Sequence, residues 1–192
     1  GYYAILGDWS RTEVDGEQVI FQDGSGMGNT LTCTLHSALD QVLGDRYERF
    51  LEKRRAKHYY PVAVARDSRC GDGVIRVELR LESGCLDRSA GLAFGLMNVG
   101  NSLVLAADVD AGELQLLSFV NNTRSFLKRT PARLSMDKWL QLEVEISGRT
   151  VRCSLDDRAQ LEFTAQSPVS GYVGLWSQGE TSAYFRNLEI QG

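Results

Sequence analysis

Two glutamates with the spacing of a catalytic pair lie in one alternating segment of the sequence. Glu143 and Glu145 are two positions apart among apolar residues, so in a strand they share a face at a separation of about 7 Å. Glycoside hydrolysis uses two carboxyl groups, about 5 to 5.5 Å apart for retention of configuration and about 6.5 to 9.5 Å apart for inversion. The spacing permits this chemistry, but an ion pair with Arg152, expected opposite Glu145, explains the same residues.

A second group of residues could bind a sugar without reacting with it. Asn98 and Asn101 flank a turn, and Asp108 ends the segment that follows. In sugar sites a few polar groups of these types orient the ligand. Trp176 could stack on a sugar ring, although a tryptophan at a strand end more often packs in the core or at its rim. We therefore interpret Asn98, Asn101, Asp108 and Trp176 as candidate carbohydrate-binding residues.

Metal and nucleotide sites are only weakly indicated. Asp108, Asp110 and Glu113 could supply oxygen ligands to calcium, but acids in such a loop more often belong to turns, and calcium needs further ligands. The four cysteines form no CxxC pair and the chain has two histidines, so the usual zinc spacings are absent. The glycine-rich stretch 24–28 lacks the pattern of a phosphate-binding loop. We predict no metal and no cofactor, with calcium as the alternative.

Strands separated by short turns must position most of these residues. Residues 75–82 and 140–146 alternate apolar and polar side chains, which is typical of strands with one buried face. Residues 91–97 and 102–107 are more continuously apolar, which indicates strands covered on both faces or facing a cleft. We therefore predict an all-β fold, a sandwich or a barrel.

One segment has helical rather than strand periodicity. Between residues 34 and 57 apolar side chains recur every three or four positions, as on one face of an amphipathic helix. We predict a helical insertion at about 31–58 within a single domain that covers 1–192. The basic C-terminal end of this helix is either solvated or a docking surface for an acidic partner.

A predicted hairpin fixes one register of the sandwich. Ser147-Gly148 suits a tight turn with glycine at the first central position. This turn places Glu145 opposite Arg152, and the alternation then directs Cys153 toward the core. We expect Cys153 to be buried and unpaired.

The bulk properties restrict the cellular context and the partners. A net charge of -4 argues against a nucleic-acid surface, and no apolar run is long enough to cross a bilayer. The sequence begins Gly1-Tyr2-Tyr3 without an initiator methionine, from which we expect that an upstream signal or anchor was removed. We expect an exported domain that is periplasmic, envelope-attached or extracellular. Free thiols are favoured because Cys70 and Cys85 bracket a strand about 30 Å long.

Several short motifs, most of them near the C-terminus, are similar to those of a known group of jelly rolls. The motifs are Gly7-Asp8-Trp9, Gly91-Leu92-Ala93-Phe94, Asp137-Lys138-Trp139, Leu142-Glu143-Val144, Leu155-Asp156-Asp157, Gly171-Tyr172-Val173-Gly174-Leu175-Trp176 and Phe185-Arg186-Asn187-Leu188. Together they resemble laminin-G-like domains, and in particular bacterial 3-keto-disaccharide hydrolase-like and family-16-glucanase-like domains. The likeness covers about the first 22 residues and residues 70 to 192.

The resemblance implies a two-sheet antiparallel jelly-roll sandwich of the concanavalin A-like kind, whose concave face commonly meets sugars, and this fold carries many functions. In such a fold we expect Asn98, Asn101 and Asp108 to lie on the rim loops of the concave sheet. The chain departs from these families at three places. Members often have an Arg after the Gly-Leu-Ala-Phe run and aromatic residues after the following Asn, where this chain has Gly95 and Ser102-Leu103. The third acid of the glucanase triplet is replaced by Ser147. These departures argue against a catalytic set on the concave face.

The sequence therefore leaves three functions open. The first is a non-catalytic, carbohydrate-associated binding domain. The alternative is a glycoside hydrolase-like enzyme acting on a di- or polysaccharide, and the third is a protein-interaction module that uses the helical insertion. Sugar panels that measure binding and turnover together would separate them.

Overall fold

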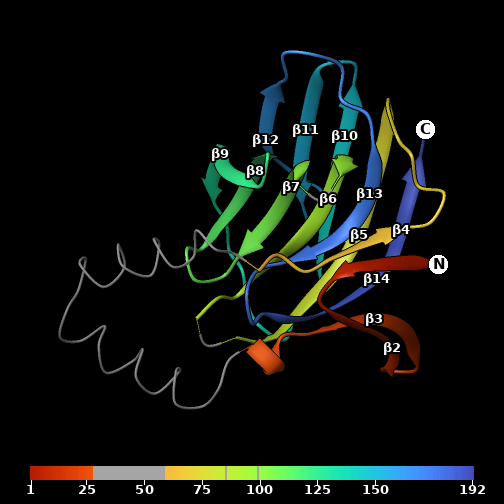
Figure 1. Ribbon diagram of the computed structural model, residues 1–192. Helices are drawn as coiled ribbons and strands as arrows, with labels where there is room; N and C mark the ends of the chain where they lie inside the picture. Colours follow the sequence, from red (N-terminus) through yellow and green to blue (C-terminus); the bar gives the residue numbers. More distant parts are fainter. Residues whose placement is uncertain (28–58, 85, 99) are drawn as a thin grey trace.

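The computed structural model describes residues 1–27, 59–84, 86–98 and 100–192, which form a sandwich of two antiparallel sheets (Figure 1). Sheet A has the order β1-β4-β13-β6-β7-β8-β9, and sheet B has the order β12-β11-β10-β5-β14-β3-β2. The strands are β1 (Tyr2–Leu6), β2 (Asp8–Val14), β3 (Glu17–Asp23), β4 (Val62–Ala65), β5 (Gly73–Ser83), β6 (Ser89–Asn98), β7 (Asn101–Asp108), β8 (Glu113–Val120), β9 (Thr123–Pro131), β10 (Leu140–Ser147), β11 (Thr150–Leu155), β12 (Arg158–Thr164), β13 (Tyr172–Ser177) and β14 (Ser182–Gln191).

This architecture confirms the predicted all-β jelly-roll sandwich. The only helical turn in the described ranges is the short 3-10 segment Ser25–Met27. The predicted helix at 34–57, within the insertion at 31–58, lies outside the described residues. In the part of the chain that the structure describes, no helix is long and apolar enough to span a bilayer.

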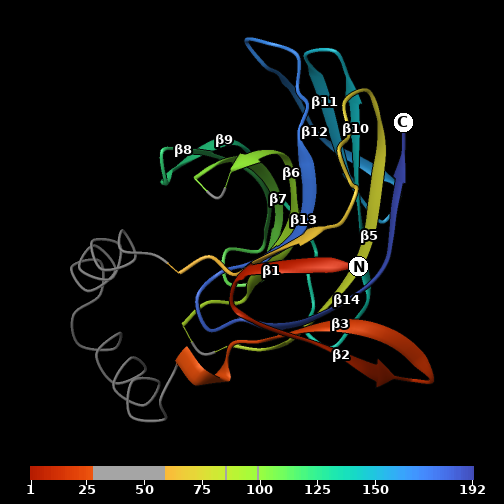
Figure 2. The same cartoon turned by 45° about the vertical axis from the view of Figure 1, so that its right-hand side comes forward.

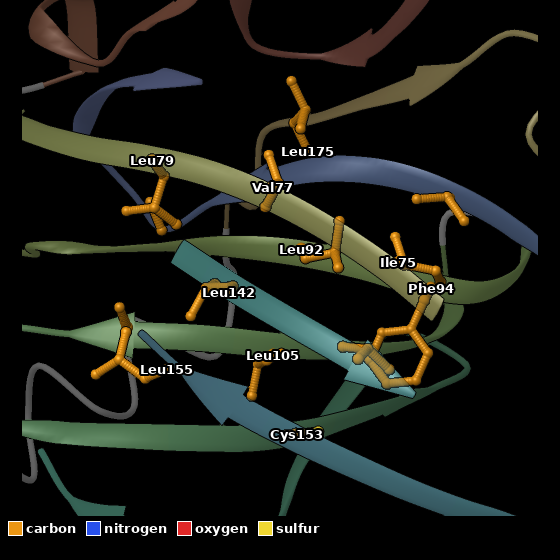
Figure 3. Close-up of a cluster of buried hydrophobic side chains, with 14 of the residues drawn as sticks. Ile75, Val77, Leu79, Leu92, Phe94, Leu105, Leu142, Cys153, Leu155 and Leu175 are labelled. Atoms are coloured by element: carbon orange, nitrogen blue, oxygen red, sulfur yellow. The ribbon is translucent and has the colours of Figure 1, made fainter. Parts of the chain in front are cut away.

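The core lies between the inner faces of the two sheets. Ile75, Val77 and Leu79 of β5 have no exposed surface, whereas the charged residues between them point outward. Figure 3 shows these side chains facing Leu92 and Phe94 of sheet A. Burial of one such side chain stabilises the fold by about 1.5 to 3 kcal/mol relative to an exposed position. The alternation read from the sequence therefore produces the buried layer directly.

The hairpin between β10 and β11 has the predicted register. Glu145 is paired with Arg152, and Val144 is paired with Cys153. Gly148 has a φ of 59°, a left-handed conformation that glycine adopts without strain. Cys153 is 2% exposed and free, as predicted, and Cys70 is also a free thiol.

Sheet A is apolar on its outer face as well, as expected for β6 and β7 if these strands are covered on both faces or face a cleft. Figure 2 shows β6 and β7 bent through a marked arc. Their outward side chains belong to a second cluster, separate from the core between the sheets. The buried members of this outer cluster are Val62, Val64, Ala93, Leu96, Val104, Ala106, Leu117, Phe119 and Trp176.

Candidate functional site

Three aromatic rings meet over the outer face of sheet A. The ring of Trp176 on β13 is stacked with the ring of Tyr60, with centroids 5.7 Å apart, and Phe119 on β8 meets Tyr60 edge-on at 4.9 Å. The Phe119 and Trp176 centroids are 6.4 Å apart. In the order of sheet A, however, β6 and β7 lie between β8 and β13. In a flat sheet these three strand spacings would place the backbones of β8 and β13 about 14 Å apart. The outer face of sheet A is therefore concave, and these rings lean together across it.

The tryptophan predicted to stack on sugar is enclosed in this cluster. Trp176 is only 1% exposed and is paired across the sheet with Gly91. A Cβ atom at Gly91 would lie 1.9 Å from the carbonyl oxygen of Leu105, so the close approach of β7 requires glycine there. In this geometry Trp176 packs against protein. A stacking role for this ring stays a prediction that would need the cluster to open.

A chain of hydrogen bonds runs beside the aromatic rings. Arg124 on β9 donates from Nη1 to Oε1 of Gln178 at 2.9 Å, and Gln178 donates from Nε2 to Oδ1 of Asp87 at 2.6 Å. The guanidinium carbon of Arg124 also lies 6.0 Å from the centroid of Tyr60. Because Gln178 follows β13, this contact joins the edge of sheet A to its middle. The position of Arg124 is thus fixed by a partner far away in the strand order.

A bulge in β9 creates an exposed site on the same face. Leu117 is paired with Phe126 and Leu116 with Lys128, so the ladder skips one residue between them. Strict alternation would direct Phe126 and Arg129 to opposite faces, whereas the extra residue brings both to the outer face with Arg124. We call Arg124, Phe126 and Arg129 the Arg-Phe-Arg strip.

The Arg-Phe-Arg strip presents an aromatic ring between two cations. The guanidinium carbons of Arg124 and Arg129 lie 5.3 and 4.8 Å from the Phe126 centroid, within the range of cation–π attraction. Phe126 is 47% exposed, in contrast to the enclosed Trp176. The strip thus offers an apolar surface bordered by hydrogen-bond donors.

Polar groups of β8 adjoin the strip. Gln115 is paired with Arg129 across the ladder and donates from Nε2 to Oε2 of Glu113 at 3.1 Å. The same oxygen of Glu113 lies 3.8 Å from Nη1 of Arg129. Asp108 on β7 is paired with Glu113. Amide, carboxylate and guanidinium groups therefore lie together at one end of the concave face.

The environment of Asp108 disfavours its charge. Burial raises the pKa of the Asp108 carboxyl, and the charges of Asp110 and Asp87 raise it further, against a hydrogen bond from the Ala111 amide that lowers it. Burial and the charge of Asp87 likewise raise the pKa of Glu180, although backbone amides donate to its carboxylate. This end of the face thus holds carboxyl groups that protonate more readily than usual.

The structure does not bring the predicted sugar-binding residues together. Asn98 accepts a hydrogen bond from Nδ2 of Asn101 at 2.8 Å, and Asn101 in turn accepts one from the amide of Asn121 at 3.1 Å. Asp108 accepts one from the amide of Ala111 at 2.9 Å, at the other end of β7 and about 23 Å from Asn101 by strand rise. Each side chain stabilises a turn, and a shared role in sugar binding remains a prediction.

The glutamate pair of the sequence analysis lies on the other side of the sandwich. Glu143 and Glu145 project from the outer face of sheet B, because their neighbours on β10 fill the core. Glu143 is paired with Nε of Arg76, and Glu145 lies 3.7 Å from Nη1 of Arg152. The ion pair expected from the sequence is present, and both carboxylates face away from the concave surface.

The carboxylates considered for calcium have protein partners. Asp110 accepts hydrogen bonds from the amide and Nε of Arg88 at 2.8 and 2.7 Å, Glu113 contacts Arg129, and Asp108 holds its turn. Within residues 1–27, 59–84, 86–98 and 100–192, no group of three or more His, Cys, Asp or Glu side chains could hold a metal ion. Calcium binding has no further support from this arrangement.

The sequence analysis did not find the Arg-Phe-Arg strip. Strand alternation alone does not locate the bulge that turns Phe126 and Arg129 to one face. The sequence does contain one indication of the strip. Two cationic residues flank an aromatic residue there, although the chain as a whole has a net charge of -4.

Comparison with known proteins identifies the fold. A carbohydrate-binding module, CBM66, from Bacillus subtilis superposes with a TM-score of 0.72 at 14% identity, covering 100% of this chain and 96% of that one. A Bacillus subtilis protein of unknown function with a galectin-like fold gives 0.63 at 11% identity, covering 99% and 88%. A suspected glycosyl hydrolase from Parabacteroides distasonis gives 0.54 at 10% identity, covering 100% and 99%.

These likenesses show the fold alone, because the identities are low. No family model matches the chain, and no curated protein matches its sequence. The matches to solved structures thus agree with the predicted jelly-roll fold. The finer resemblance to 3-keto-disaccharide hydrolase-like domains stays a prediction.

Proposed function

We propose that this domain binds carbohydrate without transforming it, through the Arg-Phe-Arg strip and the adjoining Gln115 and Glu113. The observation that carries the proposal is Phe126, an aromatic ring 47% exposed among polar side chains on a concave sheet. An aromatic face accepts the apolar side of a sugar ring, while nearby amide, carboxylate and guanidinium groups bind its hydroxyls. The fold that the chain shares with a carbohydrate-binding module supports the same assignment.

The strands that carry the site hold its side chains in a way that suits ligand binding better than catalysis. Its side chains project from β8 and β9, where the ladder fixes their spacing, and Gln178 holds Arg124 in place. Little ordering is therefore needed when a ligand binds, which lowers the entropic cost of association. Since one half-exposed ring supplies most of the apolar contact, we expect modest affinity. A role in glycan binding also agrees with our proposal that the domain is exported.

Binding to a polysaccharide panel, with two matched variants, tests the proposal. Phe126→Ala should reduce the affinity for any bound glycan about tenfold because the stacking surface is lost. Tyr3→Ala is the control, since Tyr3 is 57% exposed and lies 4.3 Å from the guanidinium carbon of Arg66, at the opposite edge of sheet A. Equal binding by wild type and Phe126→Ala, or an equal loss in Tyr3→Ala, would contradict the proposal.

A glycoside hydrolase is the second candidate, and one specific observation favours it. Asp108, with a raised pKa, is paired across the ladder with Glu113, which contacts Arg129. Retaining glycosidases likewise use two close carboxyls whose environments differ. If turnover occurs here, Glu113→Gln should abolish it. Loss in Glu143→Gln or Glu145→Gln instead would assign hydrolysis to the outer face of sheet B.

A further inference from the structure

We propose that the glycan bound at the Arg-Phe-Arg strip is acidic, a polysaccharide bearing carboxylate or sulfate groups. This inference rests on the proposed function and specifies its ligand class. It follows from the charge balance of the strip, from the geometry of its guanidinium groups and from its place at a sheet edge.

The two arginines of the strip are poorly neutralised. Arg124 has a hydrogen bond to the neutral amide of Gln178 and forms no ion pair with the described residues. Arg129 is 54% exposed and has one loose ion pair, with Glu113 at 3.8 Å. One carboxylate thus faces two guanidinium groups, and the strip keeps positive charge in a chain whose net charge is -4.

Arginines on the opposite face of the sandwich are neutralised. Arg186 on β14 contacts Glu78 at 2.7 Å and Glu17 at 2.6 Å. Arg152 on β11 lies 2.8 Å from Glu162 and 3.7 Å from Glu145. These arginines on the outer face of sheet B thus form close ion pairs with acidic residues. The two arginines of the strip, which lack such close ion pairs, distinguish the outer face of sheet A.

The geometry of the strip suits planar anions. A guanidinium group beside an aromatic ring can still present its N–H edge to a carboxylate or sulfate in a bidentate contact. Arg124 and Arg129 are about 13 Å apart along the bulged strand. A single sugar ring is too short to reach both arginines. An oligosaccharide could place one sugar on Phe126 and anionic groups near both arginines.

The edge position admits a long ligand. Among the residues that the structure describes, β9 is the edge strand of sheet A, so no further strand of that sheet lies beyond the strip. Basic side chains on an edge strand also discourage pairing with other chains, and Lys128 suits that role. That role has no use for an exposed phenyl ring between the cations, whereas a bound sugar ring can stack on it.

Paired polysaccharides that differ only in charge test the inference on the full chain. We expect polygalacturonate to bind at least about tenfold more tightly than its fully methyl-esterified form, or heparin more tightly than desulfated heparin. The first result would indicate carboxylate recognition and the second sulfate. Affinity for the acidic partner should also fall markedly between low and high salt, because exposed charges are screened.

Single charge-removing variants then locate the interaction. Arg124→Gln and Arg129→Gln should each weaken acidic-glycan binding about tenfold and weaken binding to the uncharged partner much less, because only the acidic glycan loses a charge-assisted contact. Arg152→Gln is the control, since Arg152 is an exposed arginine on the other sheet. Circular dichroism and thermal unfolding of each variant check that the sandwich is intact.

The remaining outcomes separate the two proposals. Binding that depends on Phe126 but prefers the uncharged partner would overturn the acidic ligand and leave the glycan-binding function standing. Binding to no glycan would overturn both. Single-stranded DNA or polyglutamate that binds through the same arginines as tightly as the acidic glycan would overturn the assignment to carbohydrate.

Discussion

Replacement of Trp176 by alanine distinguishes a packing role from a sugar-binding role. Trp176 is 1% exposed, and its ring contacts those of Tyr60 and Phe119. Truncation of a buried aromatic side chain to alanine costs about 3 to 5 kcal/mol, because apolar contact is lost and a cavity remains. For a chain of 192 residues this corresponds to a fall in Tm of about 6 to 20 °C.

Urea unfolding followed by far-UV circular dichroism measures this free energy without relying on tryptophan fluorescence. Tyr172→Ala is the matched control, because Tyr172 projects from the same strand and face but is 45% exposed. Its unfolding free energy should change by about 1 kcal/mol at most. If Trp176→Ala cost under about 1 kcal/mol and abolished glycan binding, the ring would be an accessible platform and the packed geometry would be wrong.

Three further outcomes are expected. Burial raises the pKa of Cys153 from 9.0 to about 12, so at pH 8 its thiolate population should be about a thousandfold below that of an ordinary thiol; mass-spectrometric mapping of alkylation should find this residue unlabelled until the protein unfolds. Asp108→Asn should raise the unfolding free energy at neutral pH and lose this advantage on acidification, as urea titrations at several pH values would show. The sign follows because a raised pKa means that the folded protein binds more protons than the unfolded chain between the two pKa values, so stability falls as pH rises through that window. Glu143→Gln and Glu145→Gln should leave glycan binding unchanged and alter the unfolding free energy by under about 1 kcal/mol each, since they break exposed or half-exposed ion pairs on the other sheet.

The sequence contained enough local information to predict the sandwich. Ile75 to Leu81 alternate with charged residues, and a strand turns such alternation into one buried face whatever its neighbours are. The Ser147-Gly148 turn determines a register over residues adjacent in sequence, so Glu145 and Arg152 could be paired in advance. Both features depend on interactions within a few residues.

The candidate site depends on features that alternation cannot encode. The bulge that brings Phe126 and Arg129 to one face follows from how β9 pairs with β8. The meeting of Phe119 with Trp176 depends on the curvature of a whole sheet. Sequence reasoning could therefore not decide between core packing and sugar stacking for Trp176, which the structure encloses, and could not foresee that Asn98 accepts a hydrogen bond within a turn.

The contacts across the concave face suggest how such a domain can diversify in evolution. The rings of Tyr60, Phe119 and Trp176 and the bond between Arg124 and Gln178 join strands that share no ladder. The depth of the hollow is thus determined partly by a few side chains, while the core between the sheets is built separately. Substitutions that conserve side-chain volume in the first set can reshape the surface while the core between the sheets keeps the fold. The structures compared above share this frame at 14% identity or less.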